Sequence, residues 1–184
     1  MARVARIITV FSIALTACGD EELQPADHIE IVQQHLNQDD IESATSAVTT
    51  GLDSLSGGSA ERLDLQGQQL EASARSGNAS EALALLEDLS EQYPEQFGYE
   101  DYLAISYWLN HARGSDGRLI HCASDGSLGA GVQEVLDAGK ARYPRHADTL
   151  FRDMEDGGTE FCGSGAGEIE SGSETQALES LGYL

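Results

Sequence analysis

Apolar residues recur at helical spacing along most of the chain, and this pattern predicts a series of amphipathic helices. The predicted helices cover residues 27–36, 39–55, 59–75, 78–92, 99–113, 132–143 and 148–154. No segment of useful length alternates apolar and polar residues as a half-buried β-strand does. The chain is therefore predicted to be all-α.

Polar residues mark where several of these helices begin and end. Asp27, Asp39 and Asn78 are each followed three residues later by a glutamate, which is the spacing of a capping box. The glycine-rich residues 56–58 and Pro144 are stop signals. Because the connections between successive helices are short, the helices are expected to pair as antiparallel hairpins.

The helix expected over residues 99–113 is apolar on most of its faces, which predicts a central place in the packing. It contains the only tryptophan of the chain, Trp108, and three of its six tyrosines. The glycine- and serine-rich residues 114–131 follow and are predicted to form a long loop. A loop of this length in a compact domain is usually functional, or held by something such as a disulfide.

The first residues have the pattern of an export signal. Arg3 and Arg6 precede a short apolar run over residues 7–15, which small residues follow. This run has about half of the roughly 20 residues that a membrane-spanning helix needs. An export signal predicts that the mature chain works outside the cytoplasm.

The sequence Leu15-Thr16-Ala17-Cys18 resembles the lipobox of bacterial lipoproteins. The resemblance implies cleavage before Cys18 and attachment of lipid to this cysteine. Gly19 stands where the family associates an aspartate with retention in the inner membrane, so the resemblance implies the outer membrane and a domain that faces the periplasm. An ordinary signal peptide with an incidental cysteine is the alternative, and the mature chain would then be secreted.

Together these patterns divide the chain into four parts. They are a signal peptide over residues 1–17, a tether over 18–26, a helical-hairpin domain over 27–162 and an acidic, Gly/Ser-rich tail over 163–184. The tail is too poor in apolar residues to fold alone and is expected to be disordered.

The charge of the chain limits its partners. The sequence has 32 acidic and 10 basic residues, a formal net charge of −22 at pH 7, and its only lysine is Lys140. Removal of the signal would make the charge more negative, because Arg3 and Arg6 lie in it. Such a chain is repelled by nucleic acid and by anionic lipid surfaces, so we expect no nucleic-acid partner.

Two cysteines, Cys122 and Cys162, remain after Cys18. In an exported chain an even pair of cysteines predicts a disulfide, with two free thiols as the alternative. The bond would close a loop of about 40 residues and contribute a few kcal/mol of stability. It would also give the predicted loop over residues 114–131 a reason to be ordered.

Residues 63–94 resemble a tetratricopeptide repeat. The likeness rests on Gly77 at the turn, on Ala82, Leu86 and Leu89 at the packing positions of the second helix, and on Pro94 at the end. Weaker likenesses have Ala44, Val48 and Gly51, and then Val132, Leu136 and Gly139, at the same three positions. The resemblance covers about residues 27–145 and implies hairpins stacked into a curved layer, as a generic hairpin array also would.

The repeat-like pattern departs from the family in its spacing. Pro94 and Pro144 lie 50 residues apart, whereas the family repeats about every 34 residues. The excess falls in the loop over residues 114–131.

The resemblance also implies a binding face. By likeness to peptide-binding tetratricopeptide proteins, helical phase directs Asp64, Gly67, Glu71, Ala74 and Arg75 toward the concave side. Tyr102, Ser106 and Asn110 could extend this face. The alternative for each is an ordinary packed or solvated residue.

A competing hypothesis is a metal or redox site in the loop, where His111, His121 and Cys122 lie within twelve residues, with Asp116 or Asp125 nearby. Their spacing matches no known ligand motif, and a disulfide would remove Cys122. No nucleophile elbow, phosphate loop or Cys-x-x-Cys occurs, and an enzyme without a readable motif stays open. The leading expectation is a lipid-anchored protein without cofactor or metal that binds a protein or peptide partner.

Overall fold

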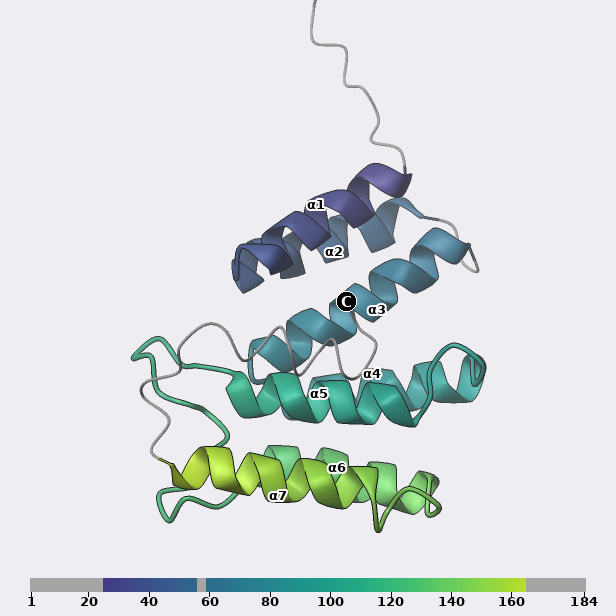
Figure 1. Ribbon diagram of the computed structural model, residues 1–184. Coiled ribbons are helices and arrows are strands. Elements are labelled where there is room, and N and C mark those ends of the chain that lie inside the picture. Colours follow the sequence, from purple (N-terminus) through teal and green to yellow (C-terminus); the bar gives the residue numbers. More distant parts are fainter. Residues whose placement is uncertain (1–24, 56–58, 165–184) are drawn as a thin grey trace, which may run out of the picture.

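A computed structural model describes residues 25–55 and 59–164, which contain seven α-helices and no β-strand (Figure 1). The helices are α1 (Pro25–Asn37), α2 (Ile41–Ser54), α3 (Ala60–Arg75), α4 (Ala79–Gln92), α5 (Tyr99–His111), α6 (Ala130–Arg142) and α7 (Leu150–Gly163). The predicted signal peptide with Cys18, most of the tether and nearly all of the predicted tail lie outside the described residues. None of these seven helices has the length and apolar character needed to cross a membrane.

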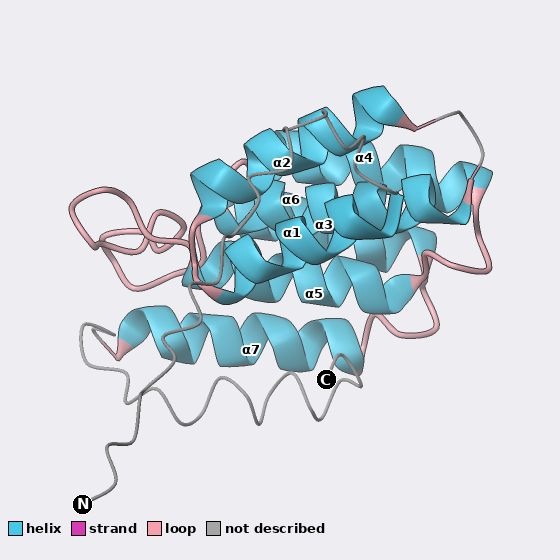
Figure 2. Cartoon of the chain, turned by 90° about the horizontal axis from the view of Figure 1, so that it is seen from above, coloured by secondary structure: helices cyan, strands magenta, loops and turns pink. Residues whose placement is uncertain are grey.

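The helices form two layers of hairpins. Helices α1, α3, α5 and α7 lie side by side in one layer, with α2, α4 and α6 behind them, as Figures 1 and 2 both show. Each helix of the first layer contacts the next one in that layer, and α1/α2, α3/α4 and α5/α6 pack as pairs. The prediction of an all-α stack of antiparallel hairpins is confirmed.

The second helices of the three hairpins bury the same pattern of residues. The buried positions are Ala44, Val48 and Gly51 in α2, Ala82, Leu86 and Leu89 in α4, and Val132, Leu136 and Gly139 in α6. Glycine is needed at two of them because the neighbouring helix comes close. A Cβ atom on Gly51 would lie 2.7 Å from Leu65 of α3, and one on Gly139 would overlap the ring of Phe151.

The apolar core has two parts that α3 connects. The smaller cluster lies among α1, α2 and α3, and the larger one joins α3 to α4, α5, α6 and Phe151 of α7. Leu65 and Ala72 of α3 belong to the smaller cluster, whereas Leu70 and Ala74 belong to the larger. Helix α3 is thus buried on two sides, and its remaining stripe faces outward.

Two helix starts differ from the sequence prediction. Pro25 opens α1 two residues before the expected start, because proline fits the first turn of a helix, where its missing N–H is not needed. Asp40 rather than Asp39 caps α2 and accepts a hydrogen bond from the Ser43 N–H at 3.1 Å. Asp39 has a positive φ of 58° and makes the turn between α1 and α2. Asn78 caps α4 as predicted, because its side-chain oxygen accepts a hydrogen bond from the Glu81 N–H at 3.4 Å. The Glu81 carboxylate accepts from the side-chain amide of Asn78 and not from its backbone N–H, so the capping box is only half formed.

Helix α7 is longer than predicted, since it continues past Met154 to Gly163. Glycines 157 and 158 disfavour a helix in isolation, and tertiary packing overrides this preference. Phe151 is fully buried, and Gly158 packs so closely that a Cβ on it would lie 2.8 Å from the Leu128 side chain.

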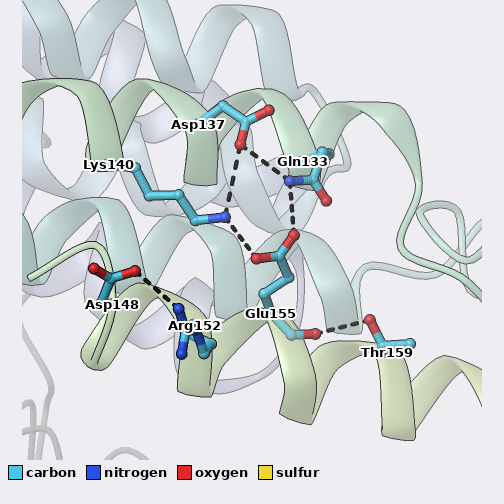
Figure 3. Close-up of polar contacts among 7 residues, drawn as sticks. All are labelled: Gln133, Asp137, Lys140, Asp148, Arg152, Glu155 and Thr159. Atoms are coloured by element: carbon cyan, nitrogen blue, oxygen red, sulfur yellow. Dashed lines mark hydrogen bonds and ion pairs between the residues drawn. The ribbon is translucent and has the colours of Figure 1, made fainter. Parts of the chain in front are cut away.

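A polar network joins α7 to α6 (Figure 3). Lys140 Nζ lies 2.5 Å from Glu155 Oε2 and 3.7 Å from Asp137 Oδ1. Gln133 donates to both of these carboxylates. The hydrogen bond from Lys140 is the largest cause that lowers the pKa of Glu155. This network holds the outer side of α7 in place.

The long loop between α5 and α6 is ordered by three kinds of contact. Cys122 and Cys162 form a disulfide, with 5.3 Å between their Cα atoms, which confirms that prediction. Short backbone bridges pair Arg113 with Leu119 and Cys122 with Leu128. His121 Nε2 lies 2.8 Å from the carbonyl oxygen of Gly77, at the turn between α3 and α4.

Candidate functional site: a groove along helix α3

The outward stripe of α3 forms the floor of a groove in the first layer of helices. The stripe consists of Asp64, Gly67, Gln68, Glu71 and Arg75, at successive spacings of three, one, three and four residues. Residues with this spacing lie on one face of a helix. Helix α1 flanks this stripe on one side and α5 on the other. We call this feature the α3 groove, and it consists of two hollows.

The first hollow lies at the N-terminal half of α3 and has a volume of about 420 Å³. Its lining residues are Ile29, Leu63, Asp64, Gly67, Gln68, Glu71, Gln96 and Phe97. Two carboxylates and two amides thus stand among apolar walls, and none of the described residues that line the hollow is basic. We call it the acidic hollow.

The second hollow lies at the C-terminal ends of α3 and α5 and has a volume of about 510 Å³. Its lining residues are Asn37, Asp39, Ile41, Arg75, Tyr107, Trp108, His111, Ala112 and Arg113. We call it the aromatic hollow. His111 lies between Tyr107 and Phe161 in a tilted ring stack, with ring centroids 4.1 and 4.4 Å apart, so the rings along this wall are fixed by packing.

An ion-pair triad links the residues that line the two hollows. Arg75 Nη1 lies 2.9 Å from Glu71 Oε1, and its Nη2 lies 2.8 Å from Asp39 Oδ1. One guanidinium is thus shared by two carboxylates from α3 and from the turn after α1. Asp64, by contrast, is exposed and makes no ion pair with any residue in the described part of the chain.

Two further residues set the shape of the acidic hollow. Gln68 Nε2 donates to the Ile29 carbonyl oxygen at 3.2 Å and fixes α1 against α3. Gly67 has no heavy atom within 4 Å of the position that a Cβ would take. The hollow is therefore open where a side chain at residue 67 would otherwise project.

The structure brings together most of the residues predicted for the binding face. Asp64, Gly67, Glu71 and Arg75 line the α3 groove, as the helical phase predicts. Ala74 is fully buried in the core and does not line it.

The three residues expected to extend the face from α5 are in the core instead, and this part of the prediction is wrong. Tyr102, Ser106 and Asn110 are 1 %, 0 % and 5 % exposed. Burial raises the pKa of the Tyr102 phenol, and the Ser106 hydroxyl donates to the Tyr102 carbonyl oxygen. The groove face of α5 carries Tyr107, Trp108 and His111, one residue further along. A shift of one residue corresponds to a rotation of about 100° around the helix axis. Because nearly all faces of α5 carry apolar residues, the sequence does not indicate which face is turned toward the groove.

The residues of the competing metal or redox hypothesis are used in other contacts. The Cys122 sulfur is bonded to Cys162, so it is not a thiolate ligand in this state. His121 contacts the Gly77 carbonyl, whereas His111 lies in the ring stack. Within residues 25–55 and 59–164, no three His, Cys, Asp or Glu side chains are grouped closely enough to hold a metal ion.

The α3 groove has the form and chemistry to bind an extended chain. Eleven residue steps separate Asp64 from Arg75, which is about 16 Å along a helix and corresponds to about five extended residues. Carboxylates, amides and aromatic rings stand along this length on helices that the core holds rigidly.

Comparison of the chain with protein-family models, with curated proteins and with solved structures finds no match in any of the three.

Proposed function

We propose that this protein is a binding module that holds an extended segment of a protein or peptide partner in the α3 groove. The observation that carries the proposal is the groove itself: the outward stripe of α3 borders two hollows over about 16 Å. Stacked helical hairpins commonly bind partners on such a face. The partner's backbone would lie along α3, with its side chains in the two hollows.

The module acts close to a membrane in this proposal. The lipobox-like sequence that ends at Cys18 supports a lipid anchor, and Gly19 supports the outer membrane with the domain in the periplasm. Seven residue steps separate Cys18 from Pro25, which is at most about 25 Å even for a fully extended chain. A partner bound in the groove would therefore be kept near the membrane surface.

Gly67→Leu tests the groove directly, because Gly67 lines the acidic hollow and a Cβ at this position meets no other atom within 4 Å. Gly157→Leu is the matched control, since Gly157 is also helical, is exposed and has open space around its Cβ position. Both variants exchange a helical glycine for a better helix former and are expected to fold. Only the first narrows the groove.

The probe is a displayed library of random ten-residue peptides, followed by titration of the selected peptides. Trp108, the only tryptophan, lines the aromatic hollow, so its fluorescence reports binding. We expect peptides selected on the wild-type protein to lose binding to Gly67→Leu and to keep it for Gly157→Leu. The proposal fails if no peptide is enriched, or if the selected peptides bind Gly67→Leu as well as wild type.

The anchor has its own test. Cells that produce the full-length chain are labelled with an alkyne fatty acid, and the wild type is compared with Cys18→Ala. We expect lipid label and membrane association for the wild type, and loss of both in the variant. Equal membrane association of the two proteins without any label would refute the anchor and leave the groove proposal intact.

A further inference from the structure

The two hollows of the α3 groove differ in charge. Among the residues that the structure describes, Asp64 and Glu71 line the acidic hollow with no basic neighbour in its lining. Arg75 and Arg113 line the aromatic hollow together with Asp39. A partner segment that lies along the groove therefore meets negative charge at one end and balancing cations at the other. This asymmetry determines which side chain suits each hollow.

The negative charge of the acidic hollow is only partly compensated. Glu71 shares the Arg75 guanidinium with Asp39, and Asp64 makes no ion pair within the described part of the chain. Three carboxylates, those of Asp39, Asp64 and Glu71, thus stand along this stretch of the groove with one guanidinium, and only two of them contact it. The net charge of −22 on the whole chain adds a long-range attraction for cations.

The walls of the acidic hollow add a second requirement. Ile29, Leu63 and Phe97 are apolar, and the side-chain amides of Gln68 and Gln96 lie among them. A bare metal ion gains nothing from apolar walls. A long side chain with a methylene stem and a cationic head can place its stem against these walls and its charge beside the carboxylates.

We infer that the acidic hollow receives an arginine or lysine side chain of the partner segment, with its cationic head beside Asp64 and Glu71. The inference rests on the proposed function of the groove and names the partner's chemistry: a basic, extended peptide. The geometry opposes an acidic peptide, because its carboxylates would face Asp64 and Glu71 without a free cation between them.

The selected peptides provide the test. We expect arginine or lysine to be enriched at one position, and replacement of this residue by neutral citrulline or norleucine to weaken binding. Asp64→Asn and Glu71→Gln are each expected to weaken binding of the cationic peptide about threefold to fivefold, as for a partly exposed ion pair. Asp88→Asn, which neutralises an exposed acid on α4 in the other layer, should leave the affinity unchanged.

The possible outcomes separate this inference from the proposed function. Peptides that need an open groove but contain no cationic residue would overturn the inference and keep the function. Cationic peptides that bind Asp64→Asn and Glu71→Gln as tightly as wild type would also overturn it, because the cation would then lie elsewhere. If no peptide is enriched, or if Gly67→Leu binds normally, the function itself fails, and the inference with it.

Discussion

Removal of the Cys122–Cys162 disulfide should lower the stability of the domain by several kcal/mol. The perturbation is the double variant Cys122→Ala/Cys162→Ala, or reduction of the wild-type protein. The bond joins the long loop to the end of α7 across a sequence separation of 40 residues. Without it, the unfolded chain regains the conformations that this cross-link excludes.

The magnitude follows from the length of the closed loop. The chain-entropy model gives about 4 kcal/mol for a loop of 40 residues. With a urea m-value of about 2 kcal/mol/M, the unfolding midpoint should fall by about 2 M. The melting temperature should fall by about 10 °C or more for a domain of this size.

The assay is urea unfolding followed by far-UV circular dichroism and by the fluorescence of Trp108. Wild type is measured with and without dithiothreitol, and the double variant serves as control because the reductant has no bond to break in it. Mass spectrometry establishes whether the disulfide is present in each sample. If oxidised wild type and the double variant unfold at the same urea concentration, the entropic reasoning is refuted.

Three further substitutions test the packing and the electrostatics. Ala82→Glu places a charge at a fully buried position and should lower the free energy of unfolding by at least about 3 kcal/mol. Its control is Ala84→Glu on the exposed side of the same helix, which should melt close to wild type. Gly139→Ala should destabilise the protein by about 1–3 kcal/mol, because the new Cβ would overlap the Phe151 ring. Gly157→Ala has open space for its Cβ and should instead stabilise the protein by up to about 1 kcal/mol. A Gly139→Ala variant that melts like wild type would contradict the close packing of α6 on α7. Glu155 has a lowered pKa in the folded protein, chiefly from the lysine hydrogen bond, so its contribution is complete above the ordinary glutamate value of about 4.5 and is lost as pH falls through the lowered value. The stability difference between wild type and Glu155→Gln should therefore shrink in acid, and a difference that grows below pH 4 would contradict the assignment.

Sequence periodicity predicted the fold well because each hairpin depends on local signals. These signals lie within a few residues of one another: Gly77 makes the turn after α3, Asn78 caps α4, and Ala82 is buried in α4. Each of them favours the structure that forms at its position. The same three buried positions recur in α2, α4 and α6, although the spacing between hairpins differs. Repeat-like packing therefore persists where the loops change length.

The features that the sequence did not predict depend on contacts between distant segments. The second half of α7 contains three glycines, and the helix is held in place by the buried Phe151 in its first turn and by the disulfide at Cys162. In α5, apolar residues occur on most faces, so the sequence does not determine the rotation of the helix. It therefore predicts Ser106 as an extension of the binding face, whereas Trp108 is the residue that lines the groove. On α3 the polar stripe is distinct, so its helical phase is enough to place Asp64, Glu71 and Arg75 along the groove.

The single lysine of the chain determines which methods can detect a partner. Lys140 is held between Glu155 and Asp137 on α6, in the layer opposite the floor of the groove. In a lipoprotein the α-amine of Cys18 is acylated, which would leave this ammonium as the only primary amine of the mature protein. Amine-reactive cross-linkers would then rarely capture a partner that is bound on α3. A photoreactive residue at position 67, or coupling through carboxylates, would report on the groove itself.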